Sequence, residues 1–211
     1  DPVALFAKLG PELVLMTAVA LCRGSVLSCF ALFFSMIGDI SGEFKALPVH
    51  GELALELQIG FFVLAHICYV VDFVRHTNYH KKEHGWRIAA FVGAGITLFY
   101  TAIVGYIVFT YGNLWSLPVK ICSALYLVML ISLIVTASQQ SRGPRIYYMM
   151  GAIFFIFSDS VIALRTFVCP IPHSATLVMS TYFIAQYLLN FPHITHIHRK
   201  SRVSGPAVSM Q

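Results

Sequence analysis

Seven apolar runs, each near the length of a membrane-spanning helix, constrain the fold of this 211-residue chain more than any other feature. A span needs about 20 apolar residues, because an α-helix rises about 1.5 Å per residue across a hydrocarbon core of about 30 Å. Charged residues make up 11% of the chain, whereas soluble domains carry about 25%. The runs are Val3–Leu21, Ser25–Ile40, Leu53–Val71, Trp86–Tyr111, Leu114–Ala137, Ile146–Arg165 and Ala175–Phe191. The sequence therefore predicts an all-α, polytopic membrane bundle with seven spans.

The basic residues predict how this bundle is oriented. Alternate connections and the C-terminal segment carry Arg23, Arg75, Lys81, Lys82, Arg142, Arg145, Arg199, Lys200 and Arg202. The positive-inside rule places these segments in the cytoplasm. We therefore expect a transmembrane bundle over 1–192 and a flexible, basic, cytoplasmic tail over 193–211. Because the net charge of +5 lies in short loops and the tail, it indicates contact with membrane lipids and argues against nucleic-acid binding.

Two aspartates, Asp39 and Asp159, end apolar runs and each follows a small residue, Gly38 or Ser158. A carboxylate in hydrocarbon costs about 2.5–3.5 kcal/mol even on insertion scales, so such groups normally face a protein interior or a wet cavity. Counted from the cytoplasmic helix ends, both aspartates lie roughly 20 Å up. They predict a shared polar site, and the alternative is an ion pair or hydrogen bond that only packs helices.

Other polar side chains occur at the same predicted height or face the bundle interior. Five fall in the outer half of the membrane: Lys8, Glu12, Glu56, Lys120 and Tyr182. Snorkelling to lipid head groups is the alternative for the acids and lysines. His66 and Tyr69 share one helical face, and Tyr182, Gln186 and Asn190 form a polar stripe at intervals of four. Gly151 and Ser158, seven residues apart, are expected to allow close helix packing.

Two histidine groups raise the alternative of a metal site. His76, His80 and His84 are spaced by four residues, and His193, His196 and His198 follow the last run. Imidazole spacing without paired carboxylates or cysteines is weak evidence for zinc. We expect lipid-facing basic segments here, with no metal and no organic cofactor.

An ordered series of short motifs runs along nearly the whole chain. It comprises Lys8 with a following proline, Gly38-Asp39, Glu56 with Gly60, Ala65-His66 with Tyr69, Tyr126, Gly151-Ala152 with Phe155, Ser158-Asp159 with Ala163, and Tyr182 with Ala185-Gln186 and Leu188. In this the chain resembles the YhhN-type lysoplasmalogenase family. The resemblance implies an eight-helix enzyme, with the first helix absent from this chain. The odd number of predicted spans agrees with this, because a chain of seven spans with its C-terminus in the cytoplasm has its N-terminus outside. The implied location is the endoplasmic reticulum membrane.

The resemblance also implies a reaction, hydrolysis of the vinyl-ether bond of lysoplasmalogens to a fatty aldehyde and glycerophosphoethanolamine or glycerophosphocholine. Such cleavage begins with protonation of the vinyl β-carbon and passes through an oxocarbenium ion, as glycoside hydrolysis does. It needs one protonated carboxyl and a second group to stabilise charge or direct water. We predict Asp39, Asp159 and His66 as catalytic residues. The predicted substrate-binding residues are Lys8, Glu56, Tyr69, Lys120, Ser158, Tyr182 and Gln186.

Three other functions stay open at this stage. Intramembrane carboxylates also relay protons or ions in transporters, a zinc-dependent membrane lipid amidohydrolase would use the histidines, and a non-catalytic scaffold would only bind lipid. The expected partners are a lysophospholipid substrate and membrane lipids, and the sequence is compatible with a homo-oligomer.

Overall fold

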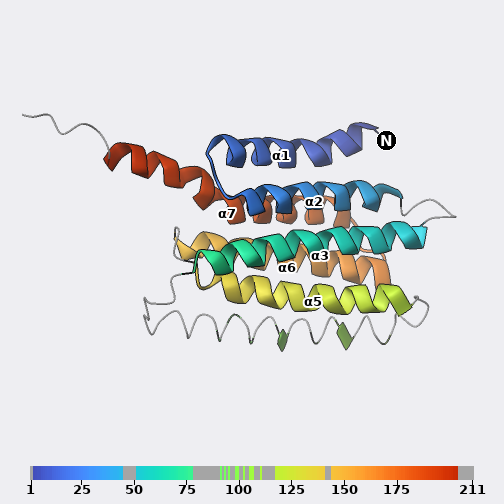
Figure 1. The fold of residues 1–211 in the computed structure, drawn as a ribbon. Helices are drawn as coiled ribbons and strands as arrows, with labels where there is room; N and C mark the ends of the chain where they lie inside the picture. The colour runs from blue at the N-terminus through green and yellow to red at the C-terminus, as the bar shows by residue number, and fades with distance from the viewer. Residues whose placement is uncertain are drawn as a thin grey trace, which may run out of the picture.

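The computed structural model describes residues 2–44, 51–77, 117–140 and 144–203, with scattered positions between 91 and 110. These parts of the chain form six named helices (Figure 1): α1 (Pro2–Leu21), α2 (Val26–Glu43), α3 (Gly51–Arg75), α5 (Leu117–Ala137), α6 (Arg145–Phe167) and α7 (Ser174–Val203). Each begins or ends within a few residues of a predicted run, except at the C-terminal end of α7. Most of the predicted span Trp86–Tyr111 lies outside the described residues.

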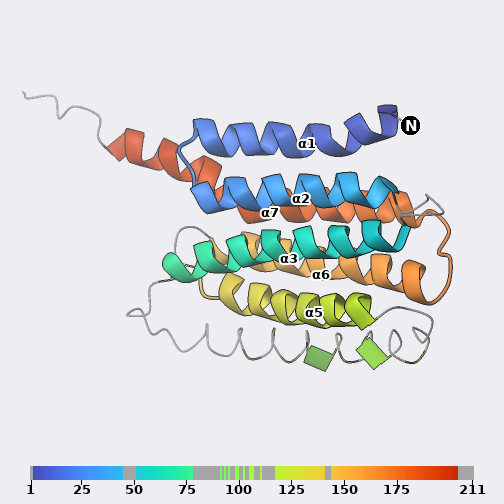
Figure 2. The ribbon, with the colours of Figure 1, turned by 45° about the vertical axis from the view of Figure 1, so that its right-hand side comes forward.

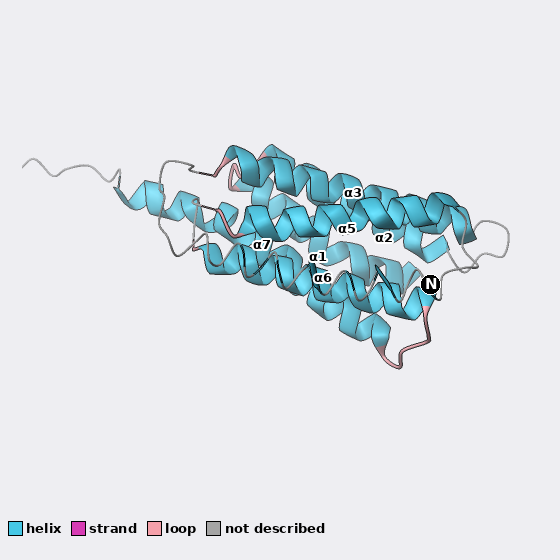
Figure 3. Ribbon diagram, turned by 90° about the horizontal axis from the view of Figure 1, so that it is seen from below, coloured by secondary structure: helices cyan, strands magenta, loops and turns pink. Residues whose placement is uncertain are grey.

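The six helices lie side by side with their axes nearly aligned (Figures 1 and 2). Each packs against its neighbour in the order α1, α2, α3, α5, α6 and α7, and α7 returns to pack against α1. The described helices therefore close a ring. Figure 3 shows the helices from below. Where the structure describes the connections between them, these are short loops. We call the end at which α6 passes into α7 the α6–α7 end, and the opposite end the α1–α2 end.

The ring exposes many large apolar side chains and buries several polar ones inside a largely apolar core. Large apolar side chains such as Phe33, Leu64, Leu125 and Ile153 are exposed, while glutamate, histidine and glutamine side chains are buried. Four described helical stretches are long and apolar enough to cross a membrane: Val26–Glu43, Gly51–Arg75, Leu117–Ser138 and Arg145–Thr166. The prediction of an all-α membrane bundle is confirmed, whereas the count of seven spans stays a prediction.

Glycines allow two pairs of helices to approach closely. A Cβ atom on Gly151 of α6 would lie 2.9 Å from Cγ of Leu189 and 3.1 Å from the carbonyl oxygen of Ala185 on α7. A Cβ on Gly38 of α2 would lie 3.1 Å from the ring of Phe62 on α3. The predicted packing role of Gly151 is confirmed. The contact at Gly38 brings α3 against α2 beside Asp39.

Helix α7 is longer than the sequence predicted. The predicted run ends at Phe191, but the helix continues through Pro192 to Val203. A buried contact accounts for part of this extension, since Nε2 of His193 lies 3.3 Å from Oδ2 of Asp72 on α3. The first part of the predicted tail is thus helical, and residues 204–211 lie outside the described chain.

Candidate functional site

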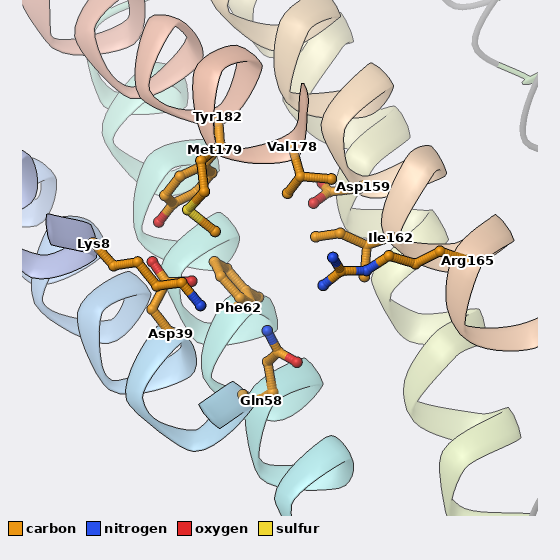
Figure 4. A pocket seen from close by; sticks show the side chains of 11 residues that line it. Lys8, Asp39, Gln58, Phe62, Asp159, Ile162, Arg165, Val178, Met179 and Tyr182 are labelled. Carbon is orange, nitrogen blue, oxygen red and sulfur yellow. The ribbon is translucent and has the colours of Figure 1, made fainter. Parts of the chain in front are cut away.

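A cavity of about 40 Å³ lies between α1, α2, α3, α6 and α7 (Figure 4). Its polar lining comes from two acids, two cations, an amide and a phenol: Asp39, Asp159, Lys8, Arg165, Gln58 and Tyr182. Apolar side chains complete the wall. A polar cavity needs a volume of only about 10–15 Å³, measured in the same way, to hold one water molecule. The cavity is thus large enough for water at two carboxyl groups.

The two aspartates reach this cavity from helices far apart in the sequence. Asp39 lies near the end of α2 and is 5% exposed, and Asp159 lies in the second half of α6 and is 9% exposed. Oδ2 of Asp159 accepts a hydrogen bond of 2.7 Å from the hydroxyl of Tyr126 on α5. Buried carboxylates are costly unless they are paired or hydrogen-bonded. The wet cavity, its cations and Tyr126 together make this burial tolerable.

A third carboxyl group, Glu12 on α1, lies next to this cavity and is only 1% exposed. The hydroxyl of Tyr182 donates a hydrogen bond to Oε1 of Glu12. The other oxygen, Oε2, has no hydrogen-bond partner within the described parts of the chain. The sequence predicted that Glu12 lies among the polar residues in the outer half of the membrane, but it did not predict Glu12 as a site residue. Its position one helical turn after Lys8 was the available signal.

A chain of hydrogen bonds continues from Tyr182 along the inside of the ring. The side-chain amide of Gln186 donates to the Tyr182 hydroxyl at 3.1 Å and to Ser35 Oγ on α2 at 3.0 Å. Its oxygen accepts from the Tyr69 hydroxyl at 2.5 Å, and Asn190 Nδ2 donates to the same hydroxyl at 2.8 Å. The predicted inward polar stripe on the last helix is confirmed. Tyr69 and Gln186 thus do not line the cavity but are joined by hydrogen bonds to Tyr182, which does.

His66 is fully buried behind the cavity wall. Nδ1 lies 2.7 Å from the carbonyl oxygen of Phe62 and donates a hydrogen bond to it. Nε2 has no hydrogen-bond partner among the residues described. The imidazole meets the rings of Tyr126 and Phe155 edge to face, with centroids 5.1 and 4.7 Å away. His66 therefore contacts Tyr126, the residue that holds Asp159, but does not line the cavity.

The predicted cations and remaining binding residues occupy different places. Lys8 lines the cavity and forms an ion pair with Glu43 on α2. Lys120 on α5 and Glu56 on α3 are not among the cavity-lining residues. Ser158 is buried, with its hydroxyl 3.3 Å from the carbonyl oxygen of Val178, and joins α6 to α7. Arg165 was not predicted as a site residue, because its place at the end of a run suggested only a loop charge.

A second polar cluster lies at the α1–α2 end. Asp72 of α3 accepts hydrogen bonds from Ser25 and, at 3.3 Å, from Ser28. His193 lies 3.3 Å from one carboxylate oxygen and His76 lies 3.2 Å from the other. The described residues hold no group of three or more His, Cys, Asp or Glu that could bind a metal ion. The predicted histidine groups are only partly visible, because His80, His84 and the side chains of His196 and His198 lie outside the described set.

Comparison with known proteins assigns the family. The model of the YhhN family matches residues 3–192. A stretch of 39 residues is 56% identical to human "Lysoplasmalogenase TMEM86A", covering 18% of this chain and 16% of that protein. A stretch of 77 residues is 34% identical to pig "Lysoplasmalogenase TMEM86B", covering 36% of this chain and 33% of that protein. These matches therefore span a third or less of each relative's length. No solved structure matches. Since the family model covers nearly the whole chain, the protein belongs to the YhhN family.

Proposed function

We propose that this protein is a membrane hydrolase that cleaves the vinyl-ether bond of lysoplasmalogens by acid–base catalysis at Asp39 and Asp159. The observation that carries the proposal is the meeting of these two carboxyl groups, from α2 and α6, at one buried, polar cavity. The relatives named lysoplasmalogenase support the choice of substrate.

The reaction needs one acid, one water molecule and no cofactor. A protonated carboxyl of the pair transfers its proton to the β-carbon of the vinyl ether, and the α-carbon and ether oxygen share the positive charge. The second carboxyl, as a carboxylate, stabilises this cation and orients water toward the α-carbon. Loss of a proton from the added water restores the acid. The hemiacetal hydroxyl then loses its proton, the bond from the former α-carbon to the glycerol oxygen breaks, and that oxygen takes up a proton, which gives a fatty aldehyde and glycerophosphoethanolamine or glycerophosphocholine.

The surrounding residues have supporting roles in this proposal. Tyr126 orients Asp159, and His66 packs on the Tyr126 ring, so His66 acts on the proposed catalytic carboxyl through Tyr126. The hydrogen-bond chain of Tyr69 and Gln186 fixes the position of the Tyr182 side chain, which lines the site. Lys8 balances the acids from the α1 side. Lys120 and Glu56 stay predicted contacts for the phosphate and the glycerol, and Ser158 supports the packing of α6 on α7. The proposed location is the endoplasmic reticulum membrane, with the C-terminus in the cytoplasm.

The test is product analysis with purified protein in detergent or liposomes. Incubation with 1-alkenyl-glycerophosphoethanolamine should release fatty aldehyde, whereas the 1-acyl analogue should remain intact. In D₂O, the trapped aldehyde should carry one deuterium at C2, because the proton added to the β-carbon comes from an exchangeable acid. In H₂¹⁸O, the label should enter the aldehyde and not the glycerol product.

The variants Asp39→Asn and Asp159→Asn should each reduce aldehyde release by at least about 10³-fold, since both carboxyl groups act on the reacting atoms. Glu52→Gln, an exposed change on α3, is the matched control and should retain activity. Unchanged turnover in both aspartate variants would remove the proposed mechanism. Hydrolysis of the acyl analogue at a similar rate would replace it with a general lysophospholipase.

A further inference from the structure

Arg165 lies on α6 and lines the cavity from the side of the α6–α7 end. It lies six positions after Asp159, so its Cα is about 9 Å further along the helix axis. Its side chain extends back toward the cavity, which it lines together with Asp159 and Ile162 (Figure 4). The guanidinium therefore faces the cavity that holds the two carboxyl groups.

Arg165 forms no direct ion pair with a described residue. No described carboxylate lies within 4.0 Å of its guanidinium, whereas Lys8, the other cation of the cavity, is paired with Glu43. A half-buried cation near an apolar wall is stabilised by an anionic partner. Guanidinium groups bind phosphate through two parallel hydrogen bonds, which lysine cannot provide. The site thus offers a phosphate-binding group at a defined distance from its acids.

We propose that Arg165 binds the phosphate of a single-chain glycerophospholipid and so places the head group at the α6–α7 end. This assignment rests on the proposed function, because it presumes that the lipid's vinyl ether lies at Asp39 and Asp159. Under it, the phosphate is a required element of the substrate, and a neutral alkenylglycerol is recognised poorly.

The dimensions of the lipid fit this arrangement. Roughly seven covalent bonds join the vinyl β-carbon to the phosphorus atom, which gives about 9 Å in an extended conformation. This is similar to the rise of about 9 Å between the Cα atoms of Asp159 and Arg165 along α6. Because the Arg165 side chain extends back toward the cavity, a phosphate bound to it leaves the β-carbon within reach of the acids without a fully extended glycerol. The alkenyl chain continues from there toward the apolar part of the bundle or the surrounding lipid.

The experiment compares a phosphate-bearing lipid with its neutral counterpart. Binding is measured with the non-hydrolysable 1-alkyl-glycerophosphocholine and with 1-alkylglycerol, and turnover with the corresponding 1-alkenyl lipids. Arg165→Gln should weaken binding of the phosphate lipid and raise its KM by about 10- to 100-fold, with a smaller change in kcat. The same variant should change the affinity for alkylglycerol much less, so the ratio of the two affinities should fall. Arg165→Lys should retain part of the phosphate affinity, because it keeps the charge but loses the paired donors.

Arg145→Gln is the matched control, because it removes an arginine from the opposite end of the same helix. It should change neither lipid's affinity. Inorganic phosphate, titrated in the same assay, should bind far more weakly than the phosphate lipid, since it lacks the apolar chain. Phosphate binding as tight as that of the lipid would indicate a free-anion site and overturn the assignment.

Failure of this inference is distinguishable from failure of the proposed function. If wild-type protein releases no aldehyde from any alkenyl lipid, the proposed function fails, while the binding comparison still tests Arg165. Equal affinity of the wild type for alkyl-glycerophosphocholine and alkylglycerol would overturn the inference without any variant. So would an Arg165→Gln protein that keeps wild-type thermal stability and loses affinity for both lipids equally.

Discussion

The hydroxyl of Tyr126 on α5 donates a hydrogen bond of 2.7 Å to Oδ2 of Asp159 on α6. The same phenol ring meets the imidazole of His66 on α3 edge to face. Tyr126 therefore ties the orientation of one proposed catalytic carboxyl to two neighbouring helices. This relationship is set by the tertiary structure, because residues 66, 126 and 159 are far apart in the sequence.

Tyr126→Phe should lower kcat for lysoplasmalogen hydrolysis by about 10-fold, because a hydrogen bond to a charged group contributes about 1.5–3 kcal/mol. The ring and its packing on His66 remain, so the melting temperature should change by only a few degrees. Parallel measurement of kcat, KM and thermal unfolding in one detergent checks this. A variant with normal kcat would show that the Tyr126 hydroxyl does not orient a catalytic group.

Tyr182→Phe should destabilise the bundle, because it leaves the buried Glu12 without the hydrogen bond that Tyr182 donates. The expected loss is about 1–3 kcal/mol in the free energy of unfolding. The matched control is Tyr187→Phe on the same helix, since Tyr187 is 51% exposed. Unfolding in mixed micelles measures both. In a double-mutant cycle, Glu12→Gln should recover part of the loss, and strict additivity would contradict a direct coupling.

Asp72→Ala should destabilise the α1–α2 end without lowering the activity per folded molecule. The change leaves the histidine and serine partners of Asp72 without their shared acceptor, and losing one member of a buried ionic pair costs about 3–5 kcal/mol. Asp72 lies ten positions after Phe62, the nearest cavity-lining residue on α3, which is about 15 Å along the helix axis. Thr195→Ala, exposed on α7, is the control. Loss of turnover in a variant of normal stability would link the two ends functionally.

Gly151→Ala should destabilise the packing of α6 on α7 by about 1–3 kcal/mol, because its Cβ would lie 2.9 Å from Leu189 and 3.1 Å from a backbone carbonyl. Gly60→Ala on α3 is a matched control, since nothing lies within 4 Å of the Cβ it would add. We expect that control to be neutral or slightly stabilising, as alanine has the higher helix propensity. Equal melting temperatures for the two variants would contradict the close approach at Gly151.

Much of the fold follows from the sequence. Apolar runs of membrane length define α2, α3, α5 and α6 to within a few residues, because hydrocarbon requires every backbone group to be bonded within a helix. The stripe of Tyr182, Gln186 and Asn190 also predicted the inner face of α7, since spacing by four residues repeats on one side of a helix. The continuation of α7 past Pro192 was missed, because its contact with Asp72 joins residues 121 positions apart.

For the site, the sequence by itself determined the residues that cannot face lipid: Asp39, Asp159, Glu12 and His66 are polar groups inside apolar runs. It could not determine which of them share a cavity, because rotation and depth of each helix depend on contacts such as Gly38 against Phe62. Only the tertiary structure placed Arg165 in the cavity lining, His66 against Tyr126 and Lys120 outside that lining. The physical reason is that the free-energy cost of placing a polar side chain in lipid is a property of each residue alone. Which polar side chains come into contact depends instead on how whole helices pack.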